Sequence, residues 1–161
     1  MNQKVFIASV LAAGGVLAQQ GGSPDRGAAI FAGKGACTSC HRVADKGSRL
    51  GVDLTEIGEL RGREALEKAL LEPAAEVQSG NRTYRVVTSD GTAHTGKLLN
   101  HDTASIQMLD SQEKLRSFPR SGVRESGFVE TPRMPSYRNK LSAQEITDLV
   151  AYLSQLKGVT R

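Results

Sequence analysis

The sequence predicts a mainly α-helical fold that carries a small inserted antiparallel β-sheet or SH3-like partial barrel. Near the N-terminus, Ser23 is placed to cap a helix whose first residue is Pro24. Near the C-terminus, Ser142 and Glu145 form the capping-box pattern of a second helix, whose apolar residues recur on one face. Between these helices, residues 79–130 change from a helical to an alternating apolar period, which is typical of strands.

An apolar leader precedes the first helix. Residues 1–18 combine a short n-region containing Lys4 with an uncharged apolar stretch and small residues at its end. Val16 and Ala18 fit the minus-three and minus-one positions of a secretory cleavage site. We therefore expect a signal peptide, with the mature chain beginning near Gln19 in the periplasm or another exported location, without a transmembrane anchor. An uncleaved N-terminal anchor is the alternative.

The segment "ACTSCH" holds both cysteines of the chain, Cys37 and Cys40, with His41 directly after the second. In an exported protein this spacing fits a disulfide, a thioredoxin-like motif or a metal site. A thioredoxin-like motif would follow a strand, whereas a helix start precedes this segment. Zinc would need two more ligands at a finger-like spacing, and His94 and His101 are too distant. The interpretation that uses all three residues is covalent attachment of one haem c, with the histidine on one axial face of the iron.

The second axial position of a haem iron has four candidate ligands in this chain: Met108, Met134, His94 and His101. Met134 lies in an irregular loop beside Pro135, just upstream of the C-terminal helix that can brace it. Met108 lies on the apolar face of a predicted strand and is more typical of a core residue. The two histidines fall on a strand start and a turn, where solvated side chains are common. Ligation by one of them is the alternative, and it would lower the reduction potential.

The haem motif and its surroundings resemble the class I cytochromes c. The segments that carry the resemblance are "GAAIFAGKGACTSCH", "LGVDLTEIG" and "MPSYRNKLSAQEITDLVAYL". Together they cover residues 24–76 and 131–158. The resemblance implies a helical fold around one haem, attached at Cys37 and Cys40, with His41 and Met134 as the iron ligands.

The same resemblance implies that the first and last helices cross, so that Gly27 and Phe31 face Tyr152. One pair of residues departs from the family pattern. The family usually has Gly-Pro after the haem motif, and the proline carbonyl orients the proximal histidine. Here the pair is Gly51-Val52, so the carbonyl is kept but the rigid proline ring is lost. The chain is also similar to haem domains that form tails of large periplasmic dehydrogenase-like proteins and carry a strand-rich insert.

The inserted segment is expected to form four short strands in a meander. The strand and turn signals are alternation over residues 84–88, a turn at Asp90-Gly91, strands over 94–99 and 103–110, and a weaker strand over 114–118 closed by Pro119. These signals divide the chain into four parts. They are a signal peptide (1–18), a first cytochrome c part (19–78), an inserted β subdomain (79–130), and a second cytochrome c part with the Met loop and C-terminal helix (131–161).

The charge distribution favours a protein partner over a nucleic acid. The formal net charge is +4, and two haem propionates would remove about two charges at neutral pH. Residues 53–76 hold seven acidic side chains, whereas residues 114–140 hold seven basic ones. The resemblance places Arg42, Lys46 and Arg49 on one side of the exposed haem edge and Arg133, Arg138 and Lys140 on the other. We therefore expect a basic face and an acidic redox partner, of which a periplasmic dehydrogenase is one candidate.

The sequence as a whole predicts an exported monohaem carrier of single electrons and no enzyme, because no nucleophile–base pattern or carboxylate pair is evident. The alternative is a haem subunit or sensor whose sixth position is open or bound by histidine and which docks to a larger dehydrogenase.

Overall fold

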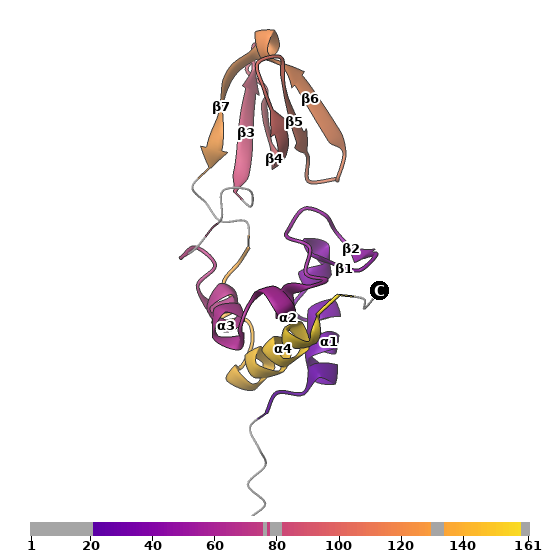
Figure 1. Ribbon diagram of the computed structural model, residues 1–161. Coiled ribbons are helices and arrows are strands. Elements are labelled where there is room, and N and C mark those ends of the chain that lie inside the picture. The colour runs from indigo at the N-terminus through magenta and orange to yellow at the C-terminus, as the bar shows by residue number, and fades with distance from the viewer. Residues whose placement is uncertain (1–20, 76, 78–81, 130–133, 159–161) are drawn as a thin grey trace, which may run out of the picture.

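The computed structural model describes residues 21–75, 77, 82–129 and 134–158, and Figure 1 shows a helical part below a β-sheet. The helical part contains α1 (Pro24–Ala32), the 3-10 turn η1 (Cys37–Ser39), α2 (Ile57–Leu60), α3 (Arg63–Leu71) and α4 (Ala143–Gln155). A small hairpin of β1 (Arg42–Val43) and β2 (Lys46–Gly47) lies between η1 and α2. The predicted signal peptide lies outside the described residues.

Helices α1 and α4 begin where the capping signals place them. The Ser23 side chain accepts a hydrogen bond from the Arg26 amide, and Pro24 is the first residue of α1. At α4, the Glu145 amide donates to Ser142 Oγ (3.3 Å) and the Ser142 amide donates to Glu145 Oε2 (2.7 Å). Both caps predicted from the sequence are therefore confirmed.

The two helices cross at a glycine. A Cβ placed on Gly27 would lie 2.6 Å from Tyr152 Cβ, so only a residue without a side chain permits this approach. The rings of Phe31 and Tyr152 meet at this crossing with centroids 5.4 Å apart. The expected meeting of Gly27 and Phe31 with Tyr152 is confirmed, and it closes the helical core around fully buried Leu149.

An ion pair between an exposed arginine and a buried aspartate joins the start of α1 to α4. Arg26 Nε lies 2.7 Å from Asp148 Oδ2, and the Ser23 amide donates to Asp148 Oδ1 at 2.7 Å. Asp148 is only 2% exposed. These hydrogen bonds, with the guanidinium contributing most, lower the pKa of Asp148 well below its usual range. The carboxylate is therefore ionised in the folded chain and links the two helices.

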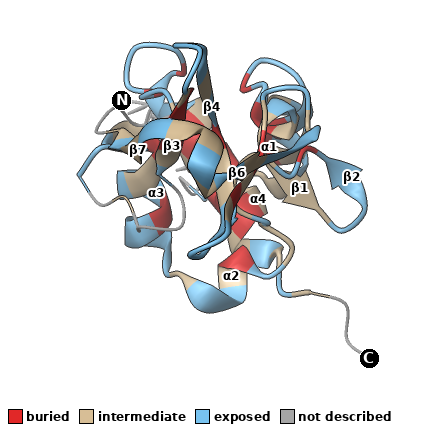
Figure 2. Cartoon of the chain, turned by 90° about the horizontal axis from the view of Figure 1, so that it is seen from above, coloured by how far each residue is buried: buried red, intermediate tan, exposed pale blue. Residues whose placement is uncertain are grey.

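The sheet has five antiparallel strands in the order β6-β5-β4-β3-β7. They are β3 (Thr83–Thr88), β4 (Ala93–His101), β5 (Ser105–Leu109), β6 (Leu115–Pro119) and β7 (Val123–Val129), with a 3-10 turn η3 (Arg120–Gly122) before the last. Tyr84, Val86, Ile106 and Met108 form a core within the sheet, separate from the helical core. Figure 2 shows the buried residues of both parts in red.

The prediction of a mainly α-helical fold is wrong. About 32% of the described residues are helical and 29% are in strands, so helix and strand contribute almost equally. One reason is the fifth strand, β7, which returns along β3 and pairs Thr83 with Val129. The other is that residues 53–75 contribute only two short helices, the four-residue α2 and the nine-residue α3. Strand β4 also extends through His101, where a turn was expected.

None of the helices within the described residues has the length and apolar character needed to cross a membrane.

Candidate haem site

The haem motif forms one tight turn. Residue Ala36 has a left-handed backbone (φ 48°), and η1 follows it directly. The amides of Cys40 and His41 both donate to the Cys37 carbonyl oxygen, at 3.1 and 2.8 Å. The turn therefore holds all three functional side chains close together. Cys37 and Cys40 are not joined as a disulfide in this turn.

Cys37 belongs to the helical core. It is buried, and burial raises the pKa of its thiol. The Tyr137 hydroxyl donates to the Gly35 carbonyl oxygen at 2.6 Å, next to the thiol. Burial, followed by the neighbouring Cys37, raises the pKa of Tyr137 to about 12, so the phenol stays protonated and keeps this hydrogen bond at neutral pH.

The imidazole of His41 is oriented by a backbone carbonyl. Its Nδ1 lies 2.8 Å from the Val52 carbonyl oxygen. A carbonyl only accepts, so Nδ1 carries the proton and the lone pair of Nε2 is available to a metal. Burial is the main cause of a lowered His41 pKa, which keeps the ring in the neutral form that ligates metals. Residue 52 was expected to keep an accepting carbonyl although it is valine and not proline. The 2.8 Å contact confirms this expectation.

Gly51 brings the loop against the imidazole. A Cβ at this position would lie 2.8 Å from His41 Nδ1, 2.9 Å from His41 Cε1 and 2.8 Å from the Cys40 carbonyl oxygen. The Gly51 amide donates to that same carbonyl. A residue with a side chain would displace either the loop or the ring, so a glycine is needed for close contact here.

Met134 lies half-buried against the helical core that contains Cys37. The segment that follows it is held by α3, because the Tyr137 amide donates to the Leu70 carbonyl (2.9 Å) and Ser136 Oγ donates to the Leu71 carbonyl (2.7 Å). The structure thus places Cys37 and Met134 on one apolar cluster, from opposite ends of the sequence.

The other three candidate ligands belong to the sheet. Met108 is fully buried in the sheet core, which confirms its interpretation as a core residue. His101 is exposed and stacks on Tyr84, with ring centroids 6.2 Å apart. His94 is half-buried against Phe118, and the centroids of the two rings lie 4.8 Å apart. The expectation of a solvated side chain is therefore wrong for this residue.

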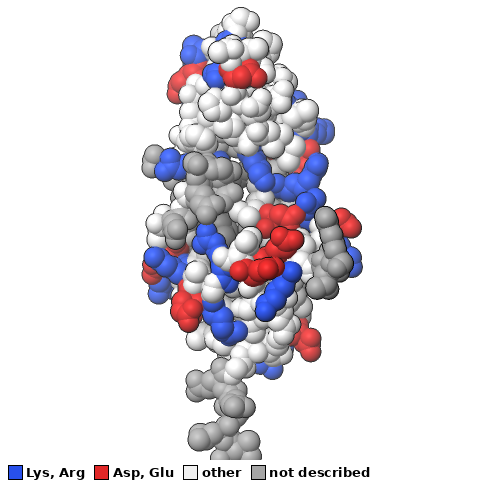
Figure 3. Space-filling view, in the orientation of Figure 1, with Lys and Arg blue, Asp and Glu red and all other residues white. Residues whose placement is uncertain are grey.

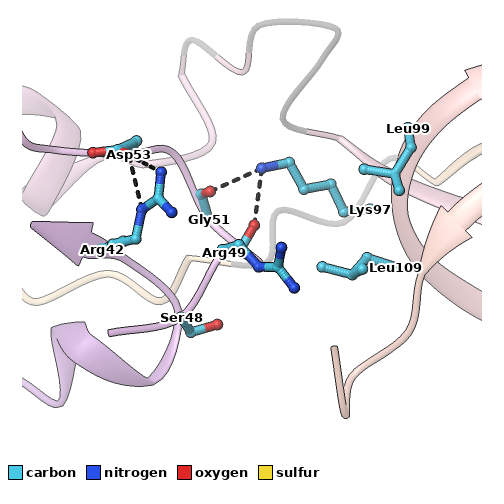
Figure 4. A pocket seen from close by; sticks show the side chains of 8 residues that line it. All are labelled: Arg42, Ser48, Arg49, Gly51, Asp53, Lys97, Leu99 and Leu109. Atoms are coloured by element: carbon cyan, nitrogen blue, oxygen red, sulfur yellow. Dashed lines mark hydrogen bonds and ion pairs between the residues drawn. The ribbon is translucent and has the colours of Figure 1, made fainter. Parts of the chain in front are cut away.

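A pocket of about 260 Å³ lies between residues 42–53, which follow His41 in the sequence, and strands of the sheet, as Figure 4 shows. Its lining residues are Arg42, Ser48, Arg49, Gly51, Asp53, Lys97, Leu99 and Leu109. Across it, Lys97 Nζ donates to the carbonyl oxygens of Arg49 (2.9 Å) and Gly51 (3.0 Å). The sequence does not predict this role of Lys97, because a lysine that contacts a loop and a lysine that points into solvent look the same in a strand pattern.

Several cations of the expected basic face are already paired. Arg42 lies 2.6 Å from Asp53, Arg138 lies 2.9 Å from Glu72, and Arg49 lies 3.5 Å from Glu113. Figure 3 shows basic and acidic side chains intermixed over one face of the molecule. Asp53 and Glu72 of the acidic segment, together with Glu113, therefore neutralise part of the expected basic face. Arg133 lies outside the described residues.

These residues fit a haem group. Two cysteine sulfurs on one turn, a neutral imidazole with Nε2 available, and a thioether on the same apolar cluster form the donor set that haem c uses. Cys37 and Cys40 would hold the porphyrin, and His41 would bind the iron.

The model of the cytochrome c family matches residues 24–106, which is 83 of the 161 residues. The match includes the haem motif and the Gly51 loop and ends before Met134. A comparison with curated proteins found no match.

Proposed function

Because the chain belongs to the cytochrome c family and carries covalently attached haem c, we propose that it is an exported monohaem carrier of single electrons whose iron is ligated by His41 and Met134. The observation that carries the proposal is the 2.8 Å contact of His41 Nδ1 with the Val52 carbonyl, which leaves Nε2 for the iron. The position of Met134 on the Cys37 cluster supports the second ligand.

The bound haem supplies a one-electron couple between ferric and ferrous iron. The residues of the chain attach it, orient its ligand and exclude water. A hydrogen bond from Nδ1 to a carbonyl fixes the tautomer and ring orientation of His41 and raises its basicity as a ligand. A thioether such as that of Met134 raises the reduction potential relative to a second imidazole. This set of roles needs no substrate site, so we infer that the protein is not an enzyme.

We propose an acidic redox partner, reached through the cations near the haem motif and the Met loop. Lys46 and Lys140 are exposed there, and Lys140 lies over the Tyr137 ring at 5.9 Å. The ion pairs of Arg42, Arg49 and Arg138 weaken this positive field at the surface, so the attraction is expected to be modest.

A second candidate is a haem subunit that docks to a larger dehydrogenase through its sheet. The observation in its favour is that the sheet region carries three exposed large apolar side chains, Leu99, Leu115 and Phe128. In this candidate the sixth position of the iron would be open or bound by a histidine.

Visible spectra of Met134→Ala holoprotein test the proposal. We expect the weak far-red sulfur-to-iron band of the ferric form to disappear and the iron to bind added ligands such as cyanide. Met108→Leu is the matched control, because Met108 lies in the sheet core and its loss should leave the band unchanged. A band that survives Met134→Ala would contradict the ligand assignment. Spectra that change instead in His94→Gln or His101→Gln would support the histidine-ligated candidate.

A further inference from the structure

The sheet reaches the haem site through one side chain. Lys97 projects from β4 and donates to the carbonyl oxygens of Arg49 and Gly51, two residues apart in the loop (Figure 4). Gly51 is followed by Val52, whose carbonyl accepts the hydrogen bond of His41 Nδ1. One peptide unit therefore separates the lysine contact from the group that orients the imidazole.

The loop has a reason to need such a contact. Glycine is conformationally permissive, so the peptide between Gly51 and Val52 has more freedom than one that proline restricts. Two hydrogen bonds from one ammonium group are charge-assisted, and each fixes a carbonyl more strongly than a neutral donor does. Lys97 thus restrains two carbonyls of the short segment that leads to Val52.

A second link joins the same loop to the same sheet. Glu113, in the turn between β5 and β6, lies 3.5 Å from Arg49. Hydrogen bonding by Ser48, followed by the Arg49 contacts, lowers the Glu113 pKa, so its carboxylate is ionised at neutral pH. The sheet accordingly contacts the loop at Ser48, Arg49 and Gly51, through Lys97 of strand β4 and through Glu113 of the turn between β5 and β6.

We propose that Lys97 is a positioning residue for the axial histidine, so that the inserted sheet supplies the rigidity that a proline at position 52 would give. The proposal rests on the proposed function in one respect, since it takes His41 as an iron ligand. It holds whichever group binds the opposite face of the iron. It makes the sheet a part of the haem site, because a strand residue controls how firmly Val52 holds the imidazole.

Hydrogen exchange of the His41 Nδ1 proton tests the proposal directly. The proton is followed by NMR in the ferrous holoprotein, in which low-spin iron is diamagnetic. We expect Lys97→Met to speed its exchange about tenfold, because two charge-assisted hydrogen bonds that oppose local opening of the loop are lost. Lys114→Met is the matched control, since it removes the same charge from an exposed position in the turn before β6 and should leave the rate unchanged.

A rescue experiment separates positioning from general stability. Val52→Pro restricts the backbone at the accepting carbonyl, and the hydrogen bonds of the described residues do not include the Val52 amide as a donor. Adding Val52→Pro to Lys97→Met should return the exchange rate toward that of the parent. Lys97→Gln, which is too short to reach both carbonyls, gives a second test if Lys97→Met fails to mature.

Equal exchange rates in Lys97→Met, Lys97→Gln and Lys114→Met would overturn the proposal, and so would a Lys97→Met rate that Val52→Pro leaves unchanged. Failure of the proposed function looks different. A parent protein whose spectra show that His41 is not an iron ligand would refute the proposed function before any lysine variant is made.

Discussion

Gly51→Ala is the substitution whose effect the structure defines most closely. The added Cβ would lie 2.8 Å from both the Cys40 carbonyl oxygen and His41 Nδ1, and 2.9 Å from His41 Cε1. All three separations are below 3.0 Å, a distance that Cβ contacts essentially never show. Neither neighbour is the free end of a flexible chain, because the carbonyl belongs to the haem turn and the ring is held by Val52. The loop or the imidazole must therefore move.

The expected cost follows from the size of such a clash. Overpacking a closely packed site by one methyl group destabilises by about 1–3 kcal/mol. For a domain of roughly 150–250 residues, each kcal/mol lowers Tm by about 2–4 °C. We expect thermal unfolding of Gly51→Ala holoprotein to show a Tm lowered by about 2–12 °C. We also expect its ferric spectrum to show a larger high-spin fraction, because a displaced ring ligates the iron less well.

Gly127→Ala is the control for this experiment. Gly127 lies in β7, where an added Cβ would meet nothing within 4 Å, so its Tm should match that of the parent or exceed it. A Gly51→Ala protein with the Tm and spectrum of Gly127→Ala would refute the reasoning, since it would mean that the loop does not press against the imidazole.

Two further predictions concern charge. Asp148→Asn should lower the free energy of unfolding by about 1–3 kcal/mol at neutral pH, because the buried side chain loses its charge-assisted hydrogen bonds with Arg26 and the Ser23 amide. The pKa of Asp148 is depressed in the folded chain, so its contribution is complete above the ordinary value of 3.8 and disappears as the pH falls further. Urea denaturation at several pH values should show a larger acid-dependent loss of stability in the parent and in exposed Glu59→Gln than in Asp148→Asn. Electron transfer to the physiological partner should slow as ionic strength rises, because the Debye length falls from ~10 Å at ~0.1 M to ~3 Å at ~1 M. The double variant Arg133→Glu, Arg138→Glu should slow association more than it shifts the potential, and a rate that is indifferent to salt would contradict the acidic-partner proposal.

The helical part of the fold was predictable because its signals are local. A cap such as Ser142 needs only a glutamate three residues later, and both residues are visible in the sequence. The haem motif is equally local, since Cys37, Cys40 and His41 lie on a single turn. The meeting of Phe31 with Tyr152 needed the family resemblance, because no local pattern links residues that far apart.

Strand β7 was missed for the opposite reason. Its residues Val123–Val129 alternate poorly, with partly buried positions that do not follow a period of two. Its place beside β3, instead of β6, depends on pairing between segments some forty residues apart. Such non-local pairing leaves no trace in the period of either strand, so the strand content of the chain was underestimated.

The contact of Lys97 with the Gly51 loop shows a further kind of non-local information. The sequence did reveal that a rigid proline is missing after the haem motif, but it could not show what takes over that role. The structure brings an ammonium group to two carbonyls of the loop from a strand that starts more than forty residues later. A sheet that only docked to a partner would not need this contact. Because the contact ends one peptide unit from the carbonyl that holds His41, we expect movement of β4 on binding a partner at the sheet to reach His41, the proposed iron ligand. The two proposed roles of the sheet, docking and support of the haem site, would then be coupled through one lysine.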